Sequence, residues 1–264
     1  MGESIVITSG KGGVGKSTTT INLGVGLALL GKKVCMIDAD IGLRNLDVLI
    51  GLENRIVYDL VDVVESKCTV EKALIRDKRC PELYLLPAAQ TKDKTDISSE
   101  QLQRVVIALK ETFDYILIDS PAGIEAGFKH AVLSADKAII VTTPENPAIR
   151  DADRVVGLLD KYNISSPKLI INKLHVHMAR SGGLLGVDEV VAVLSIDLLG
   201  VVPDSDAVIS AGHLGEPIIF EKTTLVSKSY RNIAKRIQGD VVPLLSFSSS
   251  VSFFTKIKKL IGVV

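Results

Sequence analysis

The sequence lacks tryptophan, and aromatic residues account for only 4% of its 264 residues. Hydrophobic residues nevertheless make up 47% of the chain, so the core must be built mainly from valine, isoleucine, leucine and alanine. Such cores are typical of parallel sheets that helices cover on both faces. The length suits one large core but is short for two complete domains, which predicts a single α/β domain.

Cysteine is also scarce. Cys35, Cys68 and Cys80 show neither a CxxC motif nor the Cys/His spacing of a metal site. This spacing favours buried or incidental thiols in a reducing compartment over a disulfide framework. We assign these three residues no chemistry.

The chain has no run of about 18 apolar residues, which excludes a membrane-spanning helix. Its first residues, MGESIVITSG, lack the basic region and the following apolar stretch of a secretory signal, and they do not resemble a transit peptide. We therefore expect a cytoplasmic protein, or a protein of the plastid stroma if it is plastid-encoded. Any membrane contact is expected to be peripheral.

A charge excess of either sign is missing from the whole chain, because its formal net charge is zero. This balance argues against a protein that wraps nucleic acid, and we expect no specific nucleic-acid partner. The average hides an asymmetry: residues 222–264 contain eight Lys and Arg but one acid, Asp240, for a local net charge of +7. Basic tails of this kind usually meet anionic lipid or phosphate backbones.

Short β-branched runs alternate along the chain with stretches of helical period. The predicted strands are residues 4–8, 32–38, 83–87, 115–119, 137–143, 168–172 and 198–202. One predicted helix carries the apolar stripe Leu102, Val105, Val106, Leu109 and Phe113. This alternation predicts the α/β class, with one doubly wound, mostly parallel sheet and helices on both faces. The serine cluster SFSSS, residues 246–250, is interpreted as a flexible linker between a domain over 1–245 and a separate segment over 251–264.

The segment SGKGGVGKST, residues 9–18, follows the first predicted strand and opens a helix. Gly10, Gly15, Lys16 and Ser17 fit the pattern GxxxxGK[ST], in which glycines let backbone N–H groups converge on phosphate oxygens. Lys16 is expected to reach the β and γ phosphates, and the Ser17 hydroxyl to ligate Mg²⁺. The strand before the motif and the helix after it favour this interpretation over a glycine-rich turn without a ligand.

Carboxylates at the ends of two predicted strands supply the rest of a Mg²⁺ nucleotide site, because ligands of open α/β sheets sit at that edge. Asp119 ends YILID in a Walker-B-like position, and Asp38 ends KKVCMID with Asp40 two residues later. Asp40 or a neighbour is expected to orient the attacking water. The alternative that Asp38 only caps a helix or loop stays equally open.

The base is predicted to be adenine. The segment INKLH supplies Asn172 and Lys173 of the guanine-specific pattern NKxD, but His175 stands where the aspartate belongs. ATP is therefore favoured over GTP.

The two lysines of SGKGGVGKST, together with IDADIGLRNLD, DSPAGIE and GVVPDSDAVI, resemble the ParA/MinD family of deviant-Walker P-loop ATPases, in particular its branch that selects the division site. The resemblance runs from about Ser4 to the end of the chain. It implies an ATP-sandwiched homodimer in which Lys11 of one subunit reaches the phosphates of the other, as an arginine finger supplied in trans does.

The resemblance also implies a set of site residues. Asp40 would activate water as a catalytic residue beside Lys11 and Lys16, and Ser17, Asp119 and Asp40 would hold Mg²⁺, Asp119 through water. Asn45 would respond to the γ-phosphate, while Asn172 and the turn at Pro203 and Asp204 would border adenine. The ATP-binding residues implied in this way are Lys11, Gly12, Gly13, Val14, Gly15, Lys16, Ser17, Thr18, Asn45, Asn172, Pro203 and Asp204.

The final segment, SVSFFTKIKKLIGVV, places its apolar residues on about one third of a helical circumference. The residues predicted to bind an anionic membrane are Phe253, Phe254, Lys256, Ile257, Lys258, Lys259, Leu260, Ile261 and Val264. Lysines beside a Phe-rich stripe suit an amphipathic helix that lies in the lipid interface. The pattern alone favours a terminal helix docked on its own core, whereas the serine linker and the family resemblance favour the membrane.

These features predict a slow ATPase that acts as a switch. By the resemblance, it dimerises with ATP, binds the inner membrane face, recruits a MinC-like division inhibitor and leaves when a MinE-like activator triggers hydrolysis. Arg150, Asp151 and Asp153 are partner contacts by resemblance, although a solvated helix start explains them equally well. Two alternatives remain: a chromosome or plasmid partition ATPase that binds DNA through its basic tail, and a non-catalytic scaffold that needs no Asp40.

Overall fold

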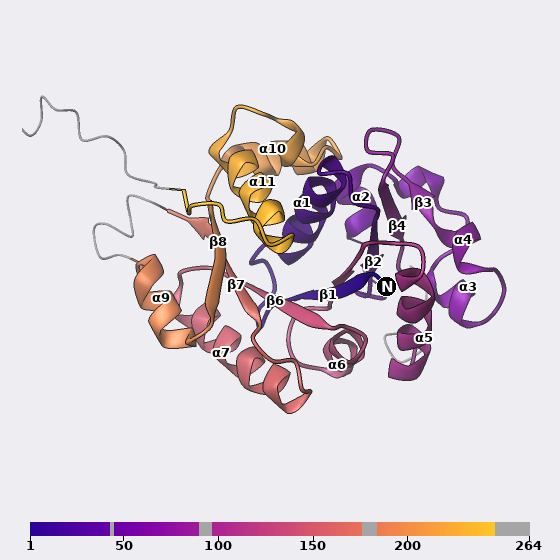
Figure 1. Ribbon diagram of the computed structural model, residues 1–264, viewed down its shortest axis with the longest axis horizontal. Helices are drawn as coiled ribbons and strands as arrows, with labels where there is room; N and C mark the ends of the chain where they lie inside the picture. Colours follow the sequence, from indigo (N-terminus) through magenta and orange to yellow (C-terminus); the bar gives the residue numbers. More distant parts are fainter. Residues whose placement is uncertain (43–44, 90–96, 176–183, 246–264) are drawn as a thin grey trace, which may run out of the picture.

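The computed structural model describes residues 1–42, 45–89, 97–175 and 184–245. Within these residues, eight strands form one sheet in the order β3-β4-β2-β5-β1-β6-β7-β8 (Figure 1). The strands are β1 Glu3–Thr8, β2 Val34–Asp38, β3 Ile75–Arg76, β4 Leu83–Leu86, β5 Tyr115–Asp119, β6 Lys137–Thr142, β7 Lys168–Leu174 and β8 Asp197–Pro203. All neighbours pair in parallel except β3 and β4, which are antiparallel. The predicted class and the seven predicted strands are confirmed.

Helices cover both faces of this sheet (Figure 1). They are α1 Lys16–Leu29, α2 Leu46–Ile50, α3 Leu60–Val64, α4 Val70–Ala73, α5 Ser99–Lys110, α6 Ala126–Leu133, α7 Asn146–Lys161, α9 Val187–Leu194, α10 Asp206–His213 and α11 Leu225–Ile237, with single 3₁₀ turns η1 Glu53–Arg55 and η2 Ile218–Phe220. Figure 1 places α1, α10 and α11 on one side, and α5, α6, α7 and α9 on the other.

The alternation of side chains along each strand divides the core into two layers. In β1, Ile5 and Ile7 pack in the layer that holds α1 and α11, whereas Val6 packs in the opposite layer with α5, α6 and α7. Both sides of the strand are apolar because both sides are covered, as parallel sheets require. The central strands are therefore rigid supports for whatever side chains follow them.

The first helix after the phosphate loop is buried nearly all round. Eleven of the 14 residues of α1 are buried, because β strands lie beneath it and α11 packs beside it. Gly24 and Gly26 allow this close approach: a Cβ on Gly24 would lie 2.7 Å from the sulfur of Met36, and one on Gly26 would lie 2.9 Å from Cβ of Ala234. The amino end of α1 is thereby held in place.

The predicted amphipathic stripe is buried, with one change at its end. Leu102, Val105, Val106 and Leu109 lie on α5, which Ser98 opens with a capping box. Phe113 comes after the last helical residue, but it is also buried, at 4% exposure, in the same core layer as the stripe. The periodicity therefore located the buried face correctly and overestimated the length of the helix.

The carboxyl ends of the central strands meet at one edge of the sheet. In the register of β2 and β5, Asp38 lies directly opposite Asp119, and Thr8 ends β1 beside them. Because the strands are parallel, the loops that follow them gather at this same edge. This is the edge at which the sequence predicts the site.

In the described part of the chain, no helix combines the length and the apolar composition that crossing a bilayer requires. The described chain continues past α11 to residue 245. The predicted serine linker, 246–250, and the predicted membrane helix, 251–264, lie outside the described residues, as do all the predicted membrane-binding side chains. The division into these three parts stays a prediction.

Candidate functional site

The loop between β1 and α1 depends on left-handed glycines. Gly13 and Gly15 have φ values of +80° and +90°, a region that only glycine enters without strain. A Cβ on Gly15 would collide with the side-chain amide of Asn172, whereas one on Gly12 or Gly13 would meet nothing within 4 Å. The loop is therefore packed on its inner side and open on its outer side, where a ligand can approach the backbone.

Lys16 and Ser17 converge on one buried carboxylate. The Nζ of Lys16 lies 2.9 Å from Oδ1 of Asp119, and the Ser17 hydroxyl donates to Oδ2 at 2.6 Å. The Thr20 hydroxyl also donates to Oδ1, at 3.0 Å. The side chains of Lys16 and Asp119 are 8% and 0% exposed, so this pair is held away from water. Thr20 was not predicted, although its place one turn after Lys16 on α1 is the signal that could have identified it.

Asp38 organises the loop that follows β2. Its carboxylate accepts hydrogen bonds from the backbone N–H groups of Asp40, Asn45 and Leu46 at 3.0, 3.0 and 3.2 Å. Burial and the nearby Asp119 carboxylate raise the pKa of Asp38 to about 7, against the opposing effect of those backbone donors. These bonds support the alternative in which Asp38 holds a loop and a helix start, and they leave Asp40 as the residue of the pair that faces the cleft.

A cleft of about 760 Å³ opens over the loop. Among the residues that line it are nine predicted ones: Lys11, Gly12, Gly13, Gly15, Lys16, Ser17, Thr18, Asp40 and Asn45. The side chain of Lys11 is 46% exposed, and its Nζ lies 3.9 Å from a carboxylate oxygen of Glu145. Lys11 thus stands at the mouth of the cleft, while Lys16 lies at its floor.

The three residues predicted to border adenine, Asn172, Pro203 and Asp204, do not line the cleft. Asn172 is 5% exposed, and its Nδ2 donates to the Val14 carbonyl at 2.8 Å. Val14 itself is 4% exposed. Pro203 ends β8, and a carboxylate oxygen of Asp204 lies 3.4 Å from Nε2 of His175; neither Pro203 nor Asp204 lines the cleft. Their contact with a base stays a prediction.

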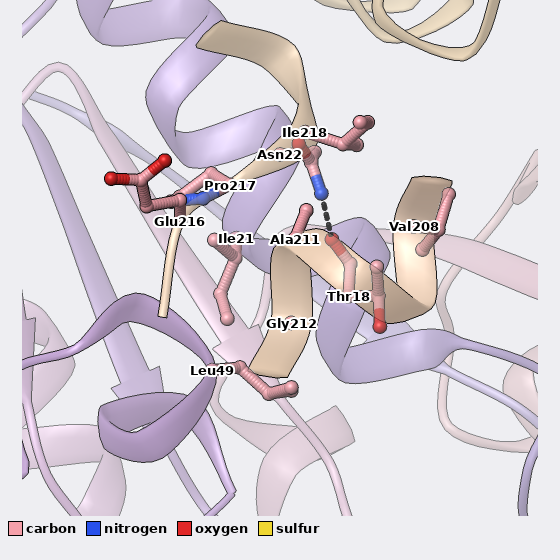
Figure 2. A pocket seen from close by; sticks show the side chains of 10 residues that line it. All are labelled: Thr18, Ile21, Asn22, Leu49, Val208, Ala211, Gly212, Glu216, Pro217 and Ile218. Carbon is pink, nitrogen blue, oxygen red and sulfur yellow. Dashed lines mark hydrogen bonds between the residues drawn. The ribbon is translucent and has the colours of Figure 1, made fainter. Parts of the chain in front are cut away.

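Sequence reasoning missed an apolar wall of the cleft. It is formed by Val48 and Leu49 of α2 and by Val208, Ile209, Gly212 and His213 of α10. The segment GVVPDSDAVI, residues 200–209, contains Val208 and Ile209. Only its turn at Pro203 and Asp204 was assigned to the site. Figure 2 shows that Leu49 and Val208 also lie around a second, smaller cavity beside Thr18, at the junction of α1, α2 and α10.

Lys173 was also missed as a cleft residue, although the segment INKLH had drawn attention to it. It has a φ of +54°, beside an irregularity in the pairing of β7 with β8. Its Nζ donates to the carbonyl of Gly13 at 2.8 Å, and it lines the cleft. A strand residue in left-handed conformation is a strained position, and here that conformation brings a third ammonium group to the loop.

The site offers hard oxygen donors suited to Mg²⁺. The Ser17 hydroxyl and the Asp40 carboxylate face the cleft, and Asp119 lies beneath Ser17. In the described residues there is no group of three or more His, Cys, Asp and Glu side chains placed to hold a metal ion by themselves. This donor set fits Mg²⁺ that is bound together with phosphate oxygens, because Mg²⁺ commonly takes one or two carboxylates and completes its shell with phosphate and water.

Comparison with known proteins connects this geometry to a family. A family model described as an AAA domain matches residues 2–170. The chain is 56% identical over 266 residues to the septum site-determining protein MinD of Bacillus subtilis, with 100% of this chain and 99% of that protein covered.

Solved structures agree with the sequence comparison. A chain of the MinC:MinD cell division protein complex of Aquifex aeolicus superposes with a TM-score of 0.87 and 47% identity, over 93% of this chain and 100% of that chain. The septum site-determining protein MinD of Pyrococcus horikoshii, complexed with Mg-ADP, superposes with a TM-score of 0.82 and 30% identity, over 90% and 96% of the two chains.

Proposed function

The chain belongs to the family of septum site-determining MinD proteins, and on this premise we propose that it is an ATP-hydrolysing switch that positions the division site. One observation carries the proposal: at the floor of the cleft, Lys16 and the partly buried Ser17 both bind the buried carboxylate of Asp119, while the exposed Lys11 lies at the mouth. A site built only to bind a nucleotide needs the first set and has no use for the second lysine.

ATP binds with its phosphates over the glycine loop. The backbone N–H groups of the loop and the positive end of α1 face the phosphate oxygens, and Lys16 exchanges part of its contact with Asp119 for the β and γ phosphates. Ser17 and Asp40 would hold Mg²⁺ together with those oxygens, and Asp119 would help to hold it through water. When bound, Mg²⁺ neutralises charge on the phosphates. The Mg-ADP complex of the Pyrococcus horikoshii relative supports this choice of ligand.

Hydrolysis uses Asp40 to position and deprotonate water. The water oxygen forms a bond to the γ-phosphorus, the bond from that phosphorus to the oxygen that bridges to the β-phosphate breaks, and Asp40 accepts the proton. Lys16 stabilises the charge on the departing ADP oxygen. Turnover is slow in the single chain, because Lys11 lies at the mouth of the cleft and does not reach the phosphates bound by its own chain.

Dimerisation completes the site. When two ATP-loaded chains meet cleft to cleft, Lys11 of each chain reaches the phosphates of the other, as a cation supplied in trans does in other P-loop enzymes. Such a dimer forms only with ATP because the γ-phosphate supplies the charge that Lys11 neutralises.

The membrane step belongs to the tail. Six apolar side chains that enter lipid contribute roughly 10 kcal/mol gross at about 1.5 to 3 kcal/mol each with incomplete burial, and ordering the tail offsets much of this. One tail therefore binds weakly. Two tails on one ATP dimer bind together with an avidity gain of about 10² or more, so that the protein sits peripherally on the inner membrane face only while ATP is intact.

The partners follow from the same premise. The complex of Aquifex aeolicus contains MinC and MinD, which supports a division inhibitor of the MinC kind as the protein recruited by this chain. Arg150 and Asp153 are exposed near the start of α7 and Asp151 is partly exposed, so they stand available as contacts for the inhibitor or for a MinE-like activator that speeds hydrolysis.

A sedimentation experiment tests the proposal against its alternatives. The full chain is mixed with anionic liposomes or with DNA, each in ATP and in ADP, while phosphate release is followed. We expect ATP-dependent pelleting with liposomes only, loss of pelleting on deletion of 252–264 or in Ile257→Glu, and retention in the control Ile257→Leu. ATP-dependent pelleting with DNA would instead identify a partition ATPase, and absence of phosphate release even with liposomes would identify a scaffold.

A further inference from the structure

Arg79 joins the two helices that form the apolar wall of the cleft, although it lies outside the cleft itself. It follows β3 in the turn that leads to β4. Its Nη2 donates to the carbonyl of Ile50, the last residue of α2, at 2.6 Å, and its Nη1 donates to the carbonyl of Gly215, two residues after α10, at 3.0 Å. Helix carboxyl ends carry partial negative charge, so a guanidinium there is favourable.

The guanidinium of Arg79 is itself fixed by Asp77 and Phe220. Asp77 is 1% exposed and lies 2.8 Å from Nη2 of Arg79, and it also accepts the backbone N–H groups of Arg79 and Cys80. Burial would raise the pKa of Asp77, but the bonds from Arg79 outweigh it and hold that pKa below its usual value. The ring of Phe220 lies 5.6 Å from the guanidinium carbon. Arg79 is therefore a fixed fork and not a mobile surface side chain.

The two helix ends that Arg79 bridges are in backbone contact. Gly51 and Gly215 both have positive φ, +70° and +64°. A Cβ on Gly215 would lie 2.8 Å from Cα of Gly51. The two backbone segments therefore pass each other here with no room for a side chain. Figure 2 shows the adjacent part of this junction, where Leu49 of α2 and Gly212 of α10 line a small cavity. Its volume is about 30 Å³.

We propose that Arg79 is a positioning residue for the nucleotide, because it locks α2 and α10 into one wall of the cleft. The helix α2 has only five residues, too few to hold its place by its own hydrogen bonds. It nevertheless carries Val48 and Leu49, which line the cleft together with Val208 and Gly212 of α10. The inference rests on the proposed function, because it takes this cleft as the ATP site.

The test compares two arginines of the same hairpin in the full chain. Arg76 is exposed, donates to the Pro81 carbonyl and stacks on Tyr84, so Arg76→Ala removes an equal charge without touching either helix. We expect Arg79→Ala to raise the KM for ATP and the Kd of ATP and ADP by about tenfold, since two charge-assisted hydrogen bonds are lost. The kcat should stay within about twofold, because the wall contributes equally to ground-state and transition-state binding.

Two further measurements separate positioning from folding. A merely structural role would reduce the active fraction, and so the apparent kcat, without moving KM. Arg79→Lys, which keeps the charge and can reach one carbonyl, should fold and show an intermediate KM, and added guanidinium should lower the KM of Arg79→Ala but not that of Arg76→Ala. Arg79 variants with the KM of Arg76→Ala would overturn this inference alone, whereas a parent chain that binds no ATP would overturn both it and the proposed function.

Discussion

In the inner half of the phosphate loop, residues 14–18, Lys16 and Ser17 already bind Asp119, whereas in the outer half, residues 11–13, Lys11 has one distant partner, Glu145. The two lysines differ accordingly in exposure, with 8% for the side chain of Lys16 and 46% for that of Lys11. The inner half is prearranged by the fold of one chain.

The difference teaches that the loop has two kinds of task. Pairs that are buried with good geometry cost much to break and therefore fix a site before its ligand arrives. An exposed pair at 3.9 Å contributes little and is easily exchanged for a better partner. The outer half is thus suited to a partner that binds after the nucleotide, as a second ATP-loaded chain would.

The largest expected effect comes from breaking the inner half. Lys16→Ala should abolish ATP binding, because it removes the phosphate cation and leaves Asp119 without its ammonium partner. It should also destabilise the fold by roughly 3 kcal/mol, so that binding must be measured on protein shown to be folded by circular dichroism. Thr20→Val serves as the control. It removes another hydrogen bond to Asp119 at about 1 to 2 kcal/mol, and it should retain ATP binding.

The second effect concerns Asp40, which follows β2 and lines the cleft. Asp40→Ala should bind ATP within about threefold of the parent and hydrolyse it about 100-fold more slowly, because the water loses its proton acceptor. ATP dimers should therefore accumulate, and size-exclusion chromatography with phosphate release would measure both results. Hydrolysis at the parent rate would show that the role assigned to Asp40 is wrong.

The third effect tests the outer half alone. Lys11→Ala should bind ATP as a monomer with nearly the parent affinity but fail to dimerise, since phosphate charge at the interface would lack its cation. Light scattering in ATP measures the mass. Glu145→Ala, which removes the other member of the exposed pair, should dimerise at least as well as the parent. A Lys11→Ala dimer as stable as the parent dimer would assign Lys11 to its own nucleotide or to no role.

The smallest effect is expected at the opposite edge of the sheet, at Asp136, which lies outside the residues that line the cleft. Partial burial opposes ionisation of Asp136, but Lys110 and Ser4 hydrogen-bond its carboxylate and lower its pKa below the usual 3.8. The stabilisation is therefore present above pH 3.8 and is lost as the pH falls through the lowered value. Asp136→Asn should cost at most about 1 kcal/mol at neutral pH, because the pair is partly exposed. In urea unfolding, parent and variant should converge in acid, with unchanged ATP affinity.

Much of the inner site could be predicted from the sequence because its signals are local. Seven apolar runs located seven of the strands. The motif GKS after the first run located the phosphate loop, because a glycine-rich segment between a strand and a helix must form the turn that joins them. Asp119 was identified because parallel strands end at a common edge. The two-residue strand β3 was missed, because two residues carry no periodicity.

The outer and apolar parts of the site depend on distant segments, which the pattern of one chain cannot bring together. Lys173 reaches Gly13 only because β7 is irregular at that point, and no local signal marks that irregularity. The wall from α10 follows from how α2 and α10 cross at Gly51 and Gly215. The same limit applies to Pro203 and Asp204, which were carried over by resemblance and lie outside the residues that line the cleft.

The central claim, that Lys11 completes the site of the other chain, is tested most directly by mixing two inactive variants. Lys11→Ala retains Asp40, and Asp40→Ala retains Lys11, so a mixed dimer has one complete site only if Lys11 acts in trans. Phosphate release from each variant alone sets the baseline. The account predicts that an equal mixture releases phosphate well above the sum of the two separate rates. A mixture whose rate equals that sum would contradict it.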